Sequence, residues 1–263
     1  MPYESLSLER RGFVAVATLQ RPDKLNALNA SLRQDTLSLA AEVAADDAIR
    51  VLVLTGAGKG FCSGADLSGG SRPPAASDQN ALLDDMGWVG RQAIAYYRMT
   101  KPVIAAVNGV AAGAGMSLAL AADMRVGGPE ARFKTVFLER NLSPDSGMSF
   151  FLPRIVGYSR AADLIFTSRD VGAEEAYRIG LLDRLVDGHP LDAAVELAEQ
   201  MAALPPLALR SAKRVLQHNI EAELEDALRF EMAGLSYARK ARNDMAESMA
   251  SFREKRPPRF TGS

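Results

Sequence analysis

A strand, a glycine-rich turn and a helix are predicted by the stretch VIAAVNGVAAGAG, residues 103–115. Its first five residues are all apolar, which is typical of a strand that is covered on both faces. The strand ends at Asn108-Gly109, and residues 114–122 are small and apolar, as in a tightly packed helix. Because glycine has no Cβ atom, the backbone of such a turn can approach a neighbouring group closely.

The same order of elements precedes this stretch. Residues 51–54 form a short apolar run that suits a second buried strand, and a glycine-dense segment, residues 56–70, follows it. Further upstream, alternating apolar residues predict a hairpin over residues 6–19. Asn29 or Ser31 can then cap a helix with one apolar face. Because strand, glycine turn and helix recur at roughly 50-residue spacing, the chain is predicted to stack related units.

Helical patterns dominate the rest of the chain. Residues 124–126 and 132–133 predict short strands, whereas residues 68–80 lack any period and predict a mobile loop. The predicted helices cover residues 81–99, 159–166, 173–179, 191–204, 207–219, 220–240 and 244–255. We therefore expect an α/β core over residues 1–195 and a helical C-terminal region over residues 196–263.

The composition argues against several classes of function. The 263 residues carry a formal net charge of -1, so the chain lacks the basic footprint of a nucleic-acid-binding protein. With one cysteine, Cys62, no disulfide can form within the chain, and two histidines argue against a transition-metal site. No apolar run reaches the ~20 residues of a membrane span, and the N-terminus lacks a secretory signal pattern. These features predict a cytoplasmic protein without a metal, nucleic-acid or membrane partner.

Two glycine turns are candidates for binding chemistry, namely GFCSGADL, residues 60–67, and NGVAAGAG, residues 108–115. The second turn leads into a helix, whose first N–H groups lack partners within the helix and favour negative charge. Two N–H groups that are aimed at one point would form an oxyanion hole. On spacing alone, the alternative that both segments are merely tight turns stays open.

Cys62 supports a second interpretation of the first turn. Residues 60–64, GFCSG, have the spacing of a nucleophile elbow with Cys62 in the nucleophile's place. That chemistry needs a histidine base, and the two histidines are His189, in an Asp-Gly-His-Pro turn, and His218, near a helix end. A buried structural cysteine is therefore the favoured interpretation. Neither the P-loop spacing nor the dinucleotide-binding spacing is present.

Asp145 differs from the other acidic residues in its surroundings. It lies in the turn LSPDSG, residues 142–147, just before the apolar residues 150–152. A carboxylate in such a turn is expected to be partly desolvated, which would make it a stronger base. The alternative, that Asp145 caps the following helix, is equally open from the local sequence.

Taken together, these segments resemble the crotonase superfamily, also called the enoyl-CoA hydratase/isomerase family. The resemblance covers essentially the whole chain and rests on RPDKLNAL (residues 21–28), GFCSGADL (60–67), KPVIAAVNG (101–109) and FREKRPPRF (252–260), in that order. It implies an α/β fold, a crotonase-like spiral of ββα units, with a helical C-terminal region that forms trimers. It also implies an acyl-CoA substrate, no separate cofactor, and assembly into a homotrimer or hexamer.

The resemblance also assigns roles to individual positions. The backbone N–H groups of Ala65 and Ala114 are the implied oxyanion-hole donors. CoA is expected to lie along residues from two segments of one chain and from the C-terminus of a neighbouring subunit. The set comprises Lys24, Leu25, Ala27, Ala65, Asp66 and Leu67, with Phe252 and Lys255 from the neighbouring subunit. The segment over residues 68–88 is expected to shape the pocket for the acyl group.

Two positions depart from the family's hydratases. Those enzymes use two glutamates, which align here with Ser117 and Phe137, so hydration by the two-glutamate route is not expected. Asp145 aligns with the single aspartate of family members that move double bonds, and the chain looks most like the ring-1,2-epoxyphenylacetyl-CoA isomerase branch. We therefore expect an acyl-CoA isomerase with Asp145 as its single acid/base, and Glu139 as the next candidate. The alternatives are an enoyl-CoA hydratase, another lyase or hydrolase of this type, and a non-catalytic CoA-ester-binding protein.

Overall fold

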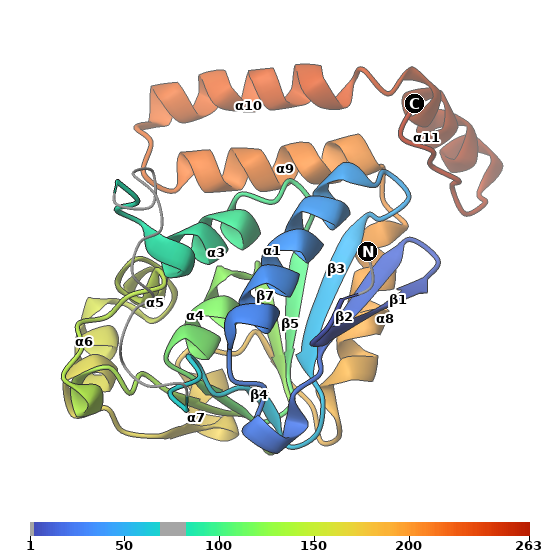
Figure 1. Cartoon of the computed structure of the whole chain (residues 1–263). Helices are drawn as coiled ribbons and strands as arrows, with labels where there is room; N and C mark the ends of the chain where they lie inside the picture. Colours follow the sequence, from blue (N-terminus) through green and yellow to red (C-terminus); the bar gives the residue numbers. More distant parts are fainter. Residues whose placement is uncertain (1–2, 69–82) are drawn as a thin grey trace.

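The larger of two sheets forms the centre of the molecule (Figure 1). The computed structural model describes residues 3–68 and 83–263. The strand order is β1-β2-β3-β5-β7-β10, in which β1 and β2 are antiparallel and the other neighbours are parallel. The bounds are β1 (Leu6–Arg11), β2 (Val14–Leu19), β3 (Val51–Gly56), β5 (Val103–Val107), β7 (Met124–Gly127) and β10 (Arg184–Leu185). The predicted hairpin and both predicted buried strands are confirmed.

A second, smaller sheet contains the strands that follow β3, β5 and β7 in the chain. Its strands are β4 (Gly60–Cys62), β6 (Val110–Ala112), β8 (Arg132–Lys134) and β9 (Val171–Gly172), with β4, β6 and β8 parallel. Since β4 follows β3, β6 follows β5 and β8 follows β7, each unit gives one strand to each sheet before its helix. The expected α/β spiral of ββα units is confirmed.

Alternate residues of the central strands face two separate cores. On β3, Leu52 belongs to one core and Val53 to the other, as expected of a strand that is covered on both faces. The first core is covered by α1 (Ala30–Ala45), α3 (Gly87–Tyr97) and α4 (Ala114–Ala121), and the second by α8 (Pro190–Ala202). The all-apolar strands therefore lie at the middle of three layers (Figure 1).

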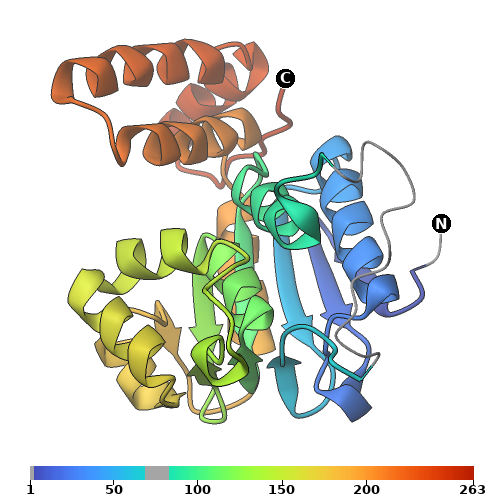
Figure 2. The same cartoon turned by 60° about the vertical axis from the view of Figure 1, so that its left-hand side comes forward.

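Three C-terminal helices project from this body (Figures 1 and 2). They are α9 (Pro206–Asn219), α10 (Leu224–Ala238) and α11 (Arg242–Glu254). Helix α10 packs along α9, yet none of the residues that the structure describes in α10 is buried. The boundary expected between residues 195 and 196 falls inside α8, which covers the sheet, so the projecting helices begin with α9.

The remaining elements connect the sheets. They are the 3-10 turns η1 (Pro22–Lys24) and η2 (Leu138–Arg140) and the helices α5 (Met148–Val156), α6 (Tyr158–Thr167) and α7 (Ala173–Arg178). Most predicted helices agree with these within a few residues, but two predicted starts are wrong.

The helix expected from residue 81 begins at Gly87, whose N–H donates to the Asp84 carboxylate at 3.1 Å. The helix expected from residue 220 begins at Leu224, because Glu223 before it is extended. Residues 69–80 of the predicted loop, together with residues 81–82, lie outside the described residues.

Within the described part of the chain, no helix combines the length and the hydropathy that crossing a membrane requires. Residues 3–68 and 83–263 also contain no group of three or more His, Cys, Asp or Glu side chains that could hold a metal ion.

Candidate active site

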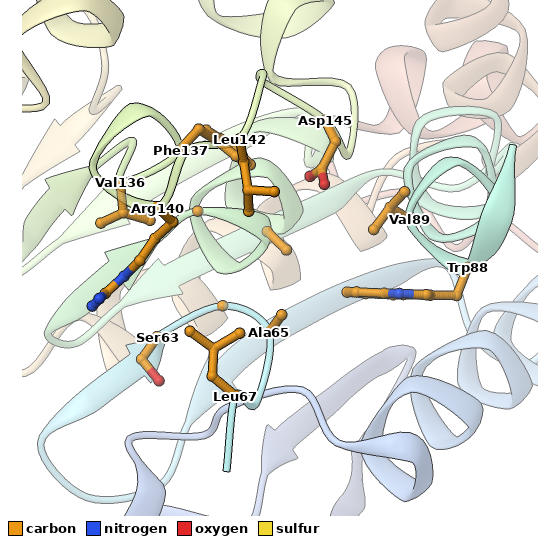
Figure 3. Close-up of a pocket in the computed structure, with 13 residues that line it drawn as sticks. Ser63, Ala65, Leu67, Trp88, Val89, Val136, Phe137, Arg140, Leu142 and Asp145 are labelled. Atoms are coloured by element: carbon orange, nitrogen blue, oxygen red, sulfur yellow. The ribbon is translucent and has the colours of Figure 1, made fainter. Parts of the chain in front are cut away.

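A cavity of about 150 Å³ opens where the two predicted glycine turns meet (Figure 3). It lies among the turn after β4, the starts of α3 and α4, and the segment that precedes α5. Its wall includes Ala65, Ala114 and Asp145, and the larger apolar side chains around them are those of Leu67, Trp88, Val89, Val136, Phe137 and Leu142. The three residues that were expected to carry the chemistry therefore reach one cavity.

The register between β4 and β6 places the two turns side by side. Cys62 pairs with Ala111, and the chain then passes through Gly64 at φ +95°. A Cβ atom on Gly64 would lie 2.7 Å from the Ala112 carbonyl oxygen and 3.5 Å from the Ala114 nitrogen. Because a side chain cannot fit there, glycine before Ala65 is what lets the two turns touch.

The Ala65 N–H points away from the loop that supports it. Leu28 N–H donates to the Gly64 carbonyl at 2.7 Å, and Asp66 N–H donates to the Leu28 carbonyl at 3.2 Å. No described peptide bond is cis, so the N–H of the peptide between residues 64 and 65 points opposite to its C=O. The Ala65 N–H is thus directed away from Leu28, and it has no acceptor among the described residues.

The Ala114 N–H lacks an acceptor for a different reason. Ala114 is the first residue of α4, and the Gly113 carbonyl accepts a hydrogen bond from Ser117 N–H at 3.0 Å. The Ala114 N–H of the same peptide therefore points out of the N-terminal end of the helix, where the helix dipole favours negative charge. No described residue accepts from it. Both expected donors are thus unpartnered at the wall of one cavity.

Asp145 reaches the same cavity from the segment before α5, and Figure 3 shows it on the side opposite Ala65. Its Oδ1 accepts a hydrogen bond from the Ser146 hydroxyl at 2.7 Å. The alternative that Asp145 caps α5 is wrong, because the N-cap is Gly147 and no side chain bonds to that end. The expected desolvation is also wrong for the single chain: Asp145 is exposed, as are residues 141–143 before it.

The two positions that were expected to align with the hydratase glutamates hold no acid. Phe137 is buried and lines the cavity, whereas Ser117 is buried in α4 and its hydroxyl has no partner within the described residues. Glu139, the next candidate, is exposed and pairs with Lys134 at 2.9 Å, outside the cavity wall. Asp145 is therefore the one acidic side chain among the described residues of the wall.

Cys62 is fully buried beneath the first turn. Its sulfur lies 3.1 Å from the Asn26 carbonyl oxygen, and burial raises the pKa of the Cys62 thiol to about 12. A thiol that stays protonated is a poor nucleophile. His189 accepts a hydrogen bond at the start of α8, and His218 stacks on Phe230 with 3.7 Å between ring centroids. The interpretation of Cys62 as a structural residue is confirmed.

The loop over residues 21–28 lies against the first turn. Ser63 N–H donates to the Leu25 carbonyl at 2.9 Å, and the Ser63 hydroxyl donates to the Lys24 carbonyl at 3.1 Å. In this loop the side chains of Lys24 and Leu25 are exposed, whereas Ala27 is buried. Three of the residues expected to contact CoA therefore adjoin the turn that carries Ala65.

The other residues expected to contact CoA fall into two groups, one beside Ala65 and one at the C-terminus. Leu67 is exposed at the cavity, and the Asp66 carboxylate pairs with Arg21 at 2.8 Å. Phe252 is 83% exposed, and Lys255 follows α11, which lies at the far end of the molecule from β4 (Figure 1). The structure does not bring the C-terminal pair to the cavity of its own chain.

Sequence reasoning missed several side chains of the cavity wall. The segment 68–88 was expected to shape the acyl pocket, and Trp88 at its end does line the cavity, but Val136 and Arg140 were not singled out. The Arg33 guanidinium stacks on Trp88, 3.8 Å from the ring centroid. Helical periodicity marks Trp88 as a partly buried position, but it carries no information about a partner in α1.

Comparisons with known proteins find relatives that match nearly the whole chain. A family model described as enoyl-CoA hydratase/isomerase matches residues 9–263. A Mycobacterium tuberculosis H37Rv protein named probable enoyl-CoA hydratase is 39% identical over 260 residues, 94% of this chain and 89% of the relative. The 1,2-epoxyphenylacetyl-CoA isomerase of Escherichia coli K12 is 35% identical over 252 residues, 95% of each chain. The crystal structure of enoyl-CoA hydratase from Bacillus anthracis has a TM-score of 0.90 at 30% identity and covers 99% of this chain and 100% of that chain.

Proposed function

Because the chain belongs to the enoyl-CoA hydratase/isomerase family, we propose that it isomerises enoyl-CoA or ring-derived acyl-CoA thioesters through an enolate. The N–H groups of Ala65 and Ala114 polarise the thioester carbonyl, and Asp145 moves the proton. The observation that carries this proposal is the composition of the cavity wall, in which Asp145 is the one acidic side chain among the described residues (Figure 3).

The thioester oxygen is the proposed acceptor for both amides. When a proton activated by the thioester is removed, negative charge moves onto this oxygen. Donors that are fixed by the backbone do not have to reorient as the charge develops, so they stabilise the enolate more than the ground state. The N-terminal position of Ala114 on α4 adds the helix dipole to this effect.

One carboxylate suffices for a double-bond shift. Asp145 takes the proton as a base and returns it as an acid to another carbon of the conjugated system, so substrate and product have the same mass. Addition of water ordinarily needs one group to activate the water and another to protonate carbon. Since Phe137 is apolar and Glu139 is paired with Lys134, the described wall offers no second acid for that role.

Hydration is the second candidate function. The relatives from M. tuberculosis and B. anthracis carry the name enoyl-CoA hydratase, whereas the relative from E. coli carries the name of an isomerase. Names therefore support both reactions, and the single acidic side chain of the described wall favours isomerisation.

We also propose that CoA lies along Lys24, Leu25 and Ala27 and beside the segment from Ala65 to Leu67. Phe252 and Lys255 would contact the CoA of a neighbouring copy, because both are exposed and far from the cavity of their own chain. A homotrimer would cover the large apolar side chains that α10 exposes, which are Leu224, Leu228, Met232 and Leu235.

Mass spectrometry of CoA esters after incubation in D2O separates the candidate functions. Isomerisation predicts a product without the mass of added water, and absorbance of the conjugated thioester rises when the double bond moves into conjugation. The product carries deuterium to the extent that the exposed Asp145 carboxyl exchanges its proton with D2O before it returns it. Hydration predicts added water and loss of that absorbance, and a non-catalytic binder predicts neither change. Hydration as the dominant reaction across a panel of enoyl-CoA esters would overturn the proposal.

A further inference from the structure

Arg21 joins the two segments that hold Ala65. One terminal nitrogen of its guanidinium lies 2.8 Å from the Asp66 carboxylate, and the other donates to the Ala27 carbonyl oxygen. The ion pair is largely shielded from solvent, since the side chains of Arg21 and Asp66 are 19% and 11% exposed. A planar guanidinium that bonds two groups at once fixes their relative positions better than a single point charge would.

The two contacts lie on either side of the Ala65 peptide. Ala27 precedes Leu28, which bridges to Ala65, and Asp66 follows Ala65. Asp66 is held further by Ser68, whose N–H and hydroxyl donate to its Oδ1 at 2.9 and 2.6 Å. Hydrogen bonds from Ser68 and the Arg21 guanidinium hold the pKa of Asp66 well below its usual range, so the carboxylate stays charged.

We propose that Arg21 is a positioning residue that keeps the Ala65 N–H aimed into the cavity. Its bonds to Ala27 and Asp66 prevent the bridge between Leu28 and Ala65 from twisting, and the direction of the Ala65 N–H follows from that bridge. The inference rests on the proposed function, because it takes the substrate carbonyl as the acceptor of this N–H. It also assigns the Asp66 carboxylate to the fold rather than to CoA.

The loop has a second anchor that does not use the Arg21 side chain. The Asn26 side chain accepts from the Arg21 backbone N–H at 2.9 Å and donates to the Gly60 carbonyl at 2.8 Å. Arg21→Met is therefore expected to leave the loop folded while it frees the peptide between residues 64 and 65. Asp66→Asn removes the charge at nearly the same shape and serves as a second variant. Arg10→Met is the matched control, because it breaks an exposed ion pair between Arg10 in β1 and Asp46 at the end of α1.

Carbonyl polarisation reports the direction of the amide without relying on turnover. Butyryl-CoA labelled with ¹³C at the thioester carbonyl is saturated, so it binds without double-bond chemistry. Difference infrared spectroscopy is expected to show the carbonyl stretch at lower frequency on the wild-type protein than in water. Arg21→Met and Asp66→Asn should reduce this shift and lower kcat roughly tenfold with a smaller change in KM, as a partial loss of one donor implies. Arg21→Lys should give a carbonyl shift and a kcat between those of Arg21→Met and the wild type. Arg10→Met should match the wild type in both.

A full carbonyl shift with wild-type kcat in folded Arg21→Met or Asp66→Asn would overturn the inference, as would the absence of any shift on the wild-type protein. Thermal unfolding of each variant establishes that it is folded. Failure of the proposed function would look different: the wild-type protein would polarise the butyryl-CoA carbonyl and yet isomerise no enoyl-CoA ester, and the dependence of the shift on Arg21 would still support the positioning role.

Discussion

The Cys62 carbonyl oxygen packs so closely against Gly115 that a Cβ atom on Gly115 would lie 2.1 Å from this oxygen. This approach packs the first turn of α4 against β4 and thereby sets Ala114 beside the turn that carries Ala65. The placement of Ala114 beside that turn therefore depends on a close approach of backbone atoms.

Gly115→Ala is expected to force α4 away from β4, because the obstacle is backbone that cannot move aside like a flexible side chain. The overpacking should cost about 1–3 kcal/mol of unfolding free energy, and activity should fall as well. Chemical denaturation measures the change. Gly188→Ala is the control, since a Cβ atom at Gly188 would meet nothing within 4 Å. Equal stability of the two variants would contradict the packing argument.

Stability at high pH should depend on Cys62. Burial raises the pKa of its thiol from 9.0 to about 12, so the folded protein keeps the thiol neutral while the unfolded chain ionises it. That contribution is present below pH 9 and is lost as the pH rises from about 9 to about 12. The unfolding midpoint of the wild type should therefore fall more steeply above pH 9 than that of Cys62→Ser. Parallel curves would contradict this assignment.

Trp88 should report ligand binding by fluorescence, because it is the single tryptophan of the chain and lines the cavity. An acyl group that enters the cavity replaces water beside the indole, so a saturated acyl-CoA should change the emission more than free CoA does. Trp88→Phe should abolish the signal. An unchanged spectrum at concentrations that calorimetry shows to be saturating would mean that the acyl group binds elsewhere.

The exposed side chains of α10 should be covered by other copies of the chain. Met232 is 61% exposed in the single chain, and a charge in a covered apolar surface is costly, so Met232→Glu should weaken assembly. Light scattering after size-exclusion chromatography measures the mass of the particle. Glu231→Gln, on the neighbouring exposed position, should leave the trimer intact. A monomeric wild-type protein would refute this prediction.

The elements that the sequence predicted best are those set by local chemistry. The Asn29 side chain accepts from Leu32 N–H at 2.9 Å and caps α1, which is one of the two caps expected there. The apolar runs of β3 and β5 were recognisable because both faces of these strands are buried. Helix starts such as that of α10 were harder to predict, because the hydrophobic periodicity of a sequence does not show where a helix end frays or a loop turns.

The site was predictable in part. The glycines marked both turns, but spacing alone left open whether the turns converge, since that depends on the pairing of β4 with β6. The resemblance to a family supplied this expectation for Ala65 and Ala114. The exposure of Asp145 was predicted wrongly, because local sequence does not show which neighbours cover a turn. Pairs such as Arg21 with Asp66 are formed by distant segments and have no sequence signature.

The rate of double-bond isomerisation by Asp145→Asn tests the central claim most directly. Loss of the proposed acid/base should lower kcat by roughly 10²- to 10⁴-fold, while the Kd for a saturated acyl-CoA should stay unchanged because both proposed amide donors remain. Glu139→Gln is the matched control and should retain activity, since Glu139 pairs with Lys134 outside the cavity wall. Near-normal isomerisation by Asp145→Asn would contradict the account.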